Sequence, residues 1–359
     1  MDTELGNKNE PEQHQNKKRM KLFLVFLNCM LMAIGQVAGP LLMRIYYLHG
    51  GKSNWLGAWL LTAGFPILII PIAITYIRAR AREQAGRLLV TKWLFGASAI
   101  LGVLLGLDSY LYSFGMSYLP VSVSSLLGSS QLAFTAIFAY IVVKHKFTHY
   151  SINAVVLMTF GSLILGFHMN GDKPRGEAKG KYILGFFMTI GGAALHGFLM
   201  PALEFTYLKA GKAITFDLVL QVQFLISMFA TLFCSIPMII NKDFQNNSDE
   251  LLSCSGYIQR SSRICLGETK YYTILLIAAI VLQFLVIGSL GVIFSSTSLL
   301  GGLVSSLLVP VQQAFAVIFL KEVFNAEKGM ALAMCLWGFA SYLYGEYQKP
   351  EANKEESTD

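Results

Sequence analysis

The amino-acid sequence predicts an all-α integral membrane protein with ten transmembrane helices, arranged as two inverted five-helix repeats. Three observations support this prediction. Of the 359 residues, 54% are hydrophobic and 14% are charged, and the mean hydropathy is +0.54, which is unlike a soluble domain. The charged residues gather in short clusters between apolar stretches of mostly about 18 residues or more, the length that a helix needs to cross hydrocarbon. A ten-residue motif also occurs once in each half of the chain.

The apolar stretches are expected to be helices, because their runs are continuous, whereas the strands of a membrane barrel alternate polar and apolar residues. The first stretch is expected to stay in the mature protein. A polar leader of about 20 residues precedes it, its apolar run is too long for a signal peptide, and no small-residue cleavage site follows. The expected spans are 22–43, 55–77, 93–114, 120–143, 150–168, 182–207, 214–240, 271–293, 298–320 and 328–347.

These spans divide the chain into a first repeat at 22–168 and a second repeat at 182–347. The longest loop, 241–270, lies in the second repeat and is expected to be extracellular. The terminal segments 1–21 and 348–359 are polar and poor in apolar residues, so disordered tails are expected there.

The orientation follows from the basic residues, which are retained on the cytoplasmic side of short loops. Up to residue 149, 12 Lys and Arg residues fall on the side of the amino end and 2, Arg44 and Lys52, on the opposite side. The amino end is therefore expected in the cytoplasm, and ten spans bring the carboxyl end back there. Topology accounts for most of the net charge of +7, so nucleic acid is not an expected partner.

The recurring motif reads FAYIVVKHKF at 138–147 and FAVIFLKEVF at 315–324, with five of ten positions identical. Each copy lies at the junction between the fourth and the fifth expected span of its repeat. Because five is an odd number, the two halves lie in the membrane with opposite orientations, as in carriers that alternate access around a central site. Two apolar helices that end in Lys-x-x-Phe can also agree by chance.

Carboxylates inside apolar spans are costly in hydrocarbon and are therefore candidates for function. Asp108 lies in the third span, where it can bind a cation or take up a proton, or can be a structural acid paired across helices. Glu204, near the cytoplasmic end of the sixth span, is a second candidate for proton coupling or an interfacial charge.

Side-chain amides within the spans suggest a site for a planar heterocycle, since each amide offers both a donor and an acceptor. Serines add a polar stripe to the fourth span, and tyrosines offer surfaces for stacking. The alternative is that these groups bridge helices by hydrogen bonds. The candidate substrate-binding residues, together with Asp108, are Gln131, Gln221, Gln283, Gln313, Ser130 and Tyr112.

No cofactor, metal or enzymatic activity is expected, because the chain contains no phosphate-binding loop, nucleophile elbow or zinc-site pattern. His168 and His196 have no second ligand at metal spacing, so a local hydrogen bond is expected for each. In the longest loop, Cys254 and Cys265 can pair in an oxidising environment or remain two free thiols. The same loop has a glycosylation sequon at Asn246.

The chain resembles the plant purine permeases of the drug/metabolite transporter superfamily along nearly all of 22–347. The matching stretches are GPLLMRIYYLHGGKSNW (39–55), TAGFPI (62–67), GLDSYLYSFGMSYLPVSVSSLLGSSQLAFTAIFAYIVVKHKFTHYSINAVVL (106–157) and FNAEKGMALAMCLWGFASYLYGE (324–346). The resemblance implies ten helices, cytoplasmic termini and proton-coupled uptake of adenine-like purines and cytokinins. It also implies that some relatives carry alkaloids or pyridoxine.

The chain departs from the family pattern at three positions. Purine-carrying relatives typically have glutamate in place of Gln221 and Gln313, and tryptophan in place of Leu282. Neutral amides remove groups that can bind a protonated base or the driving proton, and the loss of tryptophan removes a stacking surface. The resemblance therefore leaves open an uptake permease for alkaloids of the benzylisoquinoline or nicotine type.

The sequence thus predicts a secondary active, proton-coupled transporter of nitrogen heterocycles in the plasma membrane, with the vacuolar membrane left open. Its expected partners are the heterocyclic substrate, protons and the lipid bilayer. A membrane receptor that binds such a ligand without moving it is the alternative from another class. No feature of the sequence indicates an oligomeric state.

Overall fold

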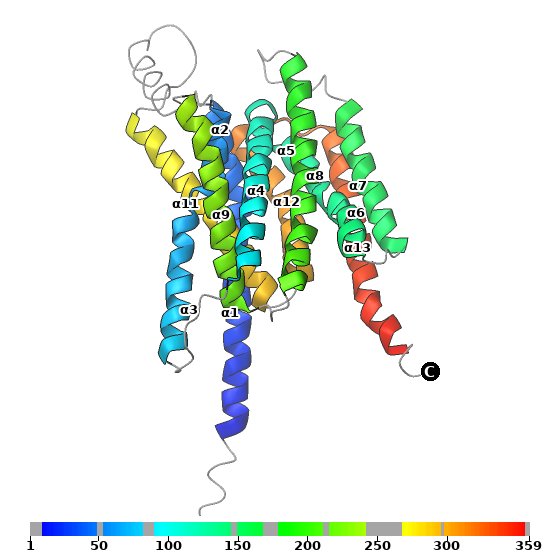
Figure 1. Ribbon diagram of the computed structural model, residues 1–359. Coiled ribbons are helices and arrows are strands. Elements are labelled where there is room, and N and C mark those ends of the chain that lie inside the picture. Colours follow the sequence, from blue (N-terminus) through cyan, green and yellow to red (C-terminus); the bar gives the residue numbers. More distant parts are fainter. Residues whose placement is uncertain are drawn as a thin grey trace, which may run out of the picture.

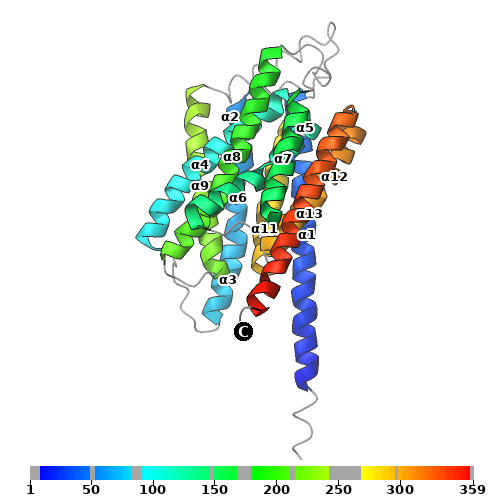
Figure 2. The same cartoon turned by 90° about the vertical axis from the view of Figure 1, so that its right-hand side faces the viewer.

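The computed structural model describes residues 9–48, 53–81, 90–144, 149–167, 179–210, 215–241, 268–295 and 298–355. Throughout these ranges the regular structure is helical, and the helices run side by side (Figures 1 and 2). They are α1 (Asn9–Leu48), α2 (Asn54–Thr62), η1 (Phe65–Leu68), α3 (Ile69–Ala81), α4 (Lys92–Tyr118), α5 (Val121–Ser129), α6 (Gln131–Val143), α7 (His149–Phe167), α8 (Lys179–Ala210), α9 (Phe216–Ile240), α11 (Glu268–Ser295), α12 (Ser298–Leu320) and α13 (Ala326–Glu355).

Six helical segments in the described part of the chain are long and apolar enough to cross a membrane. They are Leu22–Leu48, Asn54–Ile77, Lys92–Tyr118, Val121–Val142, Gly180–Ala210 and Asp217–Ile240, and shorter apolar segments occur at Ile152–Gly161, Thr273–Ser289 and Leu308–Leu320. Large apolar side chains such as Phe23, Ile240 and Trp337 are exposed. Because soluble proteins rarely expose large contiguous apolar surface, these features are those of an all-α integral membrane protein, as predicted.

Two expected spans are not single helices. The span at 55–77 consists of α2, η1 and α3, with a break at Ala63 and Gly64. Pro66, which lacks an amide donor, follows this break. The span at 120–143 is divided at Ser130 into α5 and α6. There the hydroxyls of Ser129 and Ser130 donate to the carbonyls three residues earlier, each at 2.6 Å, in competition with the helical amides.

The terminal helices are longer than the sequence suggests. Helix α1 begins at Asn9 rather than near 22, and α13 continues to Glu355 rather than ending near 347. The described parts of the segments expected to be disordered are therefore helical. Glu, Gln and Lys have good helix propensity, and adding a residue to an existing helix costs far less than starting a new one. Both helices project at the same end of the bundle (Figures 1 and 2).

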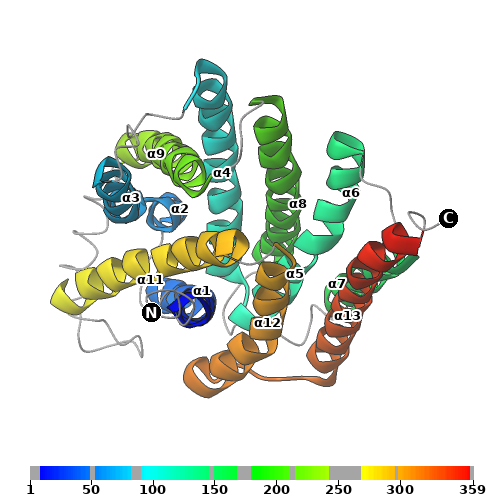
Figure 3. The ribbon, with the colours of Figure 1, turned by 90° about the horizontal axis from the view of Figure 1, so that it is seen from below.

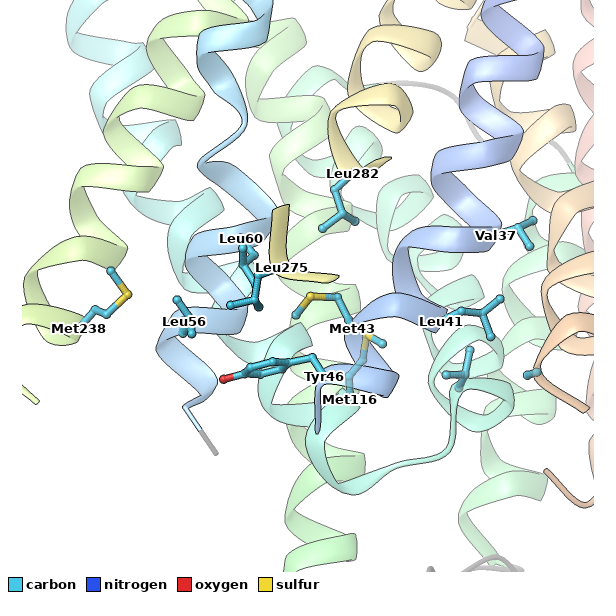
Figure 4. Packing of buried hydrophobic residues seen from close by; sticks show 12 residues of the cluster. Val37, Leu41, Met43, Tyr46, Leu56, Leu60, Met116, Met238, Leu275 and Leu282 are labelled. Atoms are coloured by element: carbon cyan, nitrogen blue, oxygen red, sulfur yellow. The ribbon is translucent and has the colours of Figure 1, made fainter. Parts of the chain in front are cut away.

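The packing places the short half-helix α5 in the interior. Helix α1 packs along α11, α4 packs along α8 and α9, and α7 packs along α13. Seen end on, α5 lies between α8 and α12 (Figure 3). Its residues Val121–Leu127 are all buried, so α5 is enclosed on every side. A second interior region, where side chains from α1, α2, α4, α9 and α11 meet, includes Met43, Leu60 and Leu282 (Figure 4).

Gly102 and Gly106 bring α4 close to α9. A Cβ atom at Gly102 would overlap with Phe229 and with the Ile226 carbonyl, and one at Gly106 would overlap with Phe233. The two glycines thus form the small-residue face that permits close approach of membrane helices.

We expect Gly102→Leu to lower the melting temperature of the purified protein in detergent, because overpacking a tight interface costs about 1–3 kcal/mol or more. Gly96→Leu is the matched control, since Gly96 lies on the same helix, is exposed, and has no atom within 4 Å of a Cβ position. Equal losses in the two variants would show that the contact with α9 is not what limits the side chain at 102.

Candidate functional site

The side chain of Gln313 on α12 is buried, but its polar atoms form no described hydrogen bonds. Its side chain is 2% exposed, and neither Oε1 nor Nε2 has a hydrogen-bond partner among the described residues. An unpaired buried polar group costs about 1–3 kcal/mol, so such groups are rare unless a ligand or water serves as the partner. Gln313 therefore has free capacity for one acceptor and two donor contacts.

Gln313 lies on a face of α12 whose residues belong to buried clusters that also contain residues of the half-helix α5. Val309 and Ala316 lie on the same face of α12 as Gln313, at spacings of four and three residues. Val309 belongs to a buried cluster with Leu126 and Leu127, whereas Ala316 belongs to a cluster with Val121. Helix α12 packs against α5, and the hydroxyl of buried Ser124 on α5 also has no described hydrogen-bond partner.

Gln283 on α11 supplies a further unpaired group at the break between α2 and η1. Its side chain is 1% exposed, and its Oε1 has no partner within the described ranges. The side chain lies directly against Gly64, where a Cβ atom would overlap with it. Two of the predicted amides therefore have unpaired polar atoms beside a half-helix or a helix break.

Asp108 on α4 and His196 on α8 form a partly buried polar pair. Asp108 Oδ2 lies 2.8 Å from His196 Nδ1, and the side chains retain 10% and 33% of their accessible surface, respectively. The partner of His196 is thus 88 positions away in sequence, not local as expected. The pairing matches one of the two interpretations of Asp108, a structural acid paired across helices. It also places a group that can accept a proton beside a carboxylate.

His196 points toward α4, away from the exposed stripe of α8. Thr189 and Gly192, which share its face of the helix, pack against Gly115 and Leu111 of α4. Leu184 and Phe187, by contrast, are exposed.

The other predicted residues have different surroundings. Gln131 is half-buried at the start of α6, where its carbonyl lies against Gly197 of α8. The Ser130 hydroxyl is engaged with the Leu127 carbonyl. Tyr112 is partly buried and packs against the cluster shown in Figure 4. Gln221 is half-buried on α9, and Glu204 is exposed on α8.

Three predicted loop residues, Asn246, Cys254 and Cys265, lie outside the described residues, as does His168. In the described part of the chain, no three His, Cys, Asp or Glu residues come close enough together to hold a metal ion.

A family model described as purine nucleobase transmembrane transport matches residues 23–352 of this chain. The chain belongs to the purine permease family. It is 42% identical to purine permease 3 of Arabidopsis thaliana over 332 residues, which cover 91% of this chain and 92% of that protein. It is 40% identical to purine permease 2 of the same plant over 345 residues, covering 95% and 96% of the two chains.

The fold of this purine permease family member also occurs among solved structures. One crystal structure superposes with a TM-score of 0.52, covering 92% of this chain and 99% of its own, at 12% identity. At this identity the similarity concerns the fold alone. The family and the apolar helices together establish a multi-pass membrane protein from a family of transporters.

Proposed function

We propose that this permease is a secondary active carrier that uses a proton gradient to take up nitrogen heterocycles across the plasma membrane. The proposed substrates are purine nucleobases, cytokinins and related compounds. The observation that carries the proposal is Gln313, whose amide is buried in the bundle interior with no described hydrogen-bond partner. An amide pairs well with the adjacent ring nitrogens and exocyclic groups of a nucleobase.

In this proposal the solute binds beside α5, between Gln313 of α12 and Gln283 of α11. The hydroxyl of Ser124 adds an unpaired group on α5 itself. Gln131, Gln221, Ser130 and Tyr112 are proposed as further wall residues. The free energy gained by pairing the orphaned amides offsets part of the cost of desolvating the solute.

Asp108 is proposed as the group that binds the driving proton, with His196 as the partner that holds its carboxylate. Its support is its burial between two long helices and its 2.8 Å contact with a second titratable side chain. Glu204 remains a second candidate, with less support because its side chain is exposed.

The proposed architecture has ten spans in two inverted repeats, 22–168 and 182–347, with both termini in the cytoplasm. Two features support it. Among the described residues, the non-glycine residues with positive φ are Lys144 at 57° and Lys321 at 53°, and both occupy the seventh position of the recurring motif. The packing of α1 on α11 also has its counterpart in α8 on α4, as expected when the first and sixth spans and the third and eighth spans exchange places.

In this orientation the loop 241–270 is extracellular. Glycosylation of Asn246 and a disulfide between Cys254 and Cys265 are predictions that belong to the same proposal.

The test is accumulation of labelled adenine in proteoliposomes with an imposed proton gradient. We expect the internal concentration to exceed the external one and to fall to the external value when a protonophore is added. Accumulation that is insensitive to the protonophore would rule out proton coupling. Saturable binding without accumulation would support the receptor instead.

An uptake permease for alkaloids is the second candidate, favoured by neutral amides at two positions of the proposed site. Gln221 and Gln313 stand where carboxylates are expected in purine carriers, and Leu282 is buried in an apolar cluster beside Gly39. Adenine, a cytokinin, a benzylisoquinoline and nicotine should be compared as competitors in the same accumulation assay. Competition by the alkaloids alone would favour the second candidate.

A further inference from the structure

The interior half-helix α5 is capped by the other half of the chain. Its N-cap residue is Pro120, which makes no side-chain capping hydrogen bond. The first amides of α5 instead donate to the carboxylate of Glu322, about 200 residues away. The Val121 amide lies 2.7 Å from Oε1 and the Ser122 amide lies 3.0 Å from Oε2. The Ser122 hydroxyl donates to Oε2 at 2.6 Å.

The chain turns sharply to place Glu322 there. Helix α12 ends at Leu320, and Lys321 adopts the left-handed conformation with φ of 53°. This conformation is unfavourable for a residue with a side chain, so it persists only where the surroundings stabilise it. It brings the next side chain onto the start of α5. An anion at a helix N-terminus interacts favourably with the helix dipole, and its charge strengthens the hydrogen bonds.

A buried arginine fixes the same turn from the first half. Arg44 of α1 donates through Nη1 to the carbonyls of Met116, at 2.8 Å, and Ser117, at 3.0 Å, in the last turn of α4. Arg44, α4 and α5 all belong to the first repeat, so Arg44 holds the α4–α5 turn within its own half. Glu322 belongs to the second repeat, so its contacts join the two halves.

We propose that Glu322 is the latch of a gate, which holds α5 to the end of α12 when this end of the carrier is closed and releases it when this end opens. The proposal rests on the proposed function, because a gate is needed only if the protein alternates access. In the proposed orientation this end is extracellular.

A cap that served only to stabilise α5 needs no residue from the other half. A serine or aspartate at position 120 would supply it locally, as at most helix N-termini. Because the capping carboxylate comes from the other half, the α5 amides have this hydrogen-bond partner only in the closed arrangement. When the halves separate, water entering the path can solvate both the amides and the carboxylate, so the bonds favour one state without preventing the other.

The test distinguishes a latch from a stabilising cap by replacing the capping group from the other half with a local one. Glu322→Ala removes the contacts, and Pro120→Asp in the same chain restores a local cap that does not join the halves. The reporter is a cysteine at Ser124, one turn inside α5, in a background without the five native cysteines. Its labelling by a membrane-impermeant thiol reagent is measured on intact yeast cells. Adenine uptake and the melting temperature are measured for the same Glu322 and Pro120 variants in chains that keep Ser124.

We expect Glu322→Ala to raise the labelling rate at least about tenfold, the effect of losing one strong contact present only in the closed state, and to reduce uphill uptake. The double variant should regain the melting temperature but neither the low labelling rate nor the uptake. Ser122→Ala, which removes one of the three contacts, should give a smaller increase in labelling. Pro120→Asp alone controls for the new side chain.

Recovery of both slow labelling and uptake in the double variant would overturn the latch, as would unchanged labelling in Glu322→Ala. Failure of the proposed function looks different. In that case the chain with native Ser124 and Glu322 accumulates no labelled solute, whereas the labelling comparison does not depend on transport.

Discussion

Asp108→Asn is expected to abolish uphill uptake while leaving exchange of labelled for unlabelled substrate across the membrane largely intact. The asparagine side chain can keep a hydrogen bond to His196, whose Nδ1 lies 2.8 Å from Asp108 Oδ2, but it cannot bind and release a proton. A carrier without its proton-binding group loses the link between gradient and solute but can still bind and move the solute. Coupling between two sites typically changes an affinity by about 5–150-fold. We therefore expect the ratio of internal to external substrate concentration to decrease by a factor of that size.

The measurement is done in proteoliposomes, with accumulation driven by a proton gradient and exchange measured without one. Loss of accumulation with retained exchange supports proton binding at Asp108. Equal loss of both activities would instead indicate that the variant no longer binds or moves the solute.

A purely structural role for Asp108 makes a different prediction. Removing one partner of a pair that lies away from water leaves the other group unpaired and destabilises a protein, whereas replacing both partners is far less costly. If the pair only holds α4 to α8, Asp108→Asn with His196→Gln should recover both folded protein and uphill uptake. For a proton site, the double variant should fold but fail to accumulate substrate. The melting temperature of each variant is the control that makes the comparison valid.

The sequence is sufficient to predict helical membrane structure, because hydropathy reports directly on the cost of placing a side chain in lipid. It does not predict where an apolar span breaks. The division of 120–143 at Ser130 depends on hydroxyls that bond to the preceding turn, and serines in membrane helices often point elsewhere. Likewise, the hydropathy of 55–77 shows no interruption at Gly64, where the helix breaks. Only the nearby Pro66 indicates a break there.

Side chains that meet across the bundle are harder to predict from one sequence. Asp108 stood out because an acid inside a span is rare, but His196 could not be identified as its partner, since pattern and hydropathy contain no information on which faces of two helices meet. Glu322 lies in the recurring motif, but a charge just beyond the end of a span has the sequence pattern of an ordinary interfacial residue. Its contact with the start of α5, about 200 residues earlier, is visible only in the structure.

Gln313→Leu is expected to stabilise the empty protein and to weaken substrate binding at least about tenfold, equivalent to 1.4 kcal/mol. The two effects have one origin. In the absence of solute, both polar atoms of the Gln313 amide are buried without a described hydrogen-bond partner, at a cost of about 1–3 kcal/mol for each group. Leucine has a similar size and no polar atoms, so it removes this cost but cannot pair with a heterocycle. The measurements are the melting temperature without ligand and the dissociation constant for labelled adenine, both in detergent.

The opposite signs of these two effects distinguish a binding residue from a structural one. An amide that bridged helices would leave its partners unpaired when replaced, so Gln313→Leu would then lower the melting temperature. Gln312→Leu is the matched control, because Gln312 is also buried but points about 100° away around α12. A stabilised Gln313→Leu variant that still binds adenine as well as the unmodified protein would remove Gln313 from the site. Gln313→Glu completes the series, because a carboxylate that recovers binding of a protonated base but not of a neutral one would show that residue 313 contacts the ring directly.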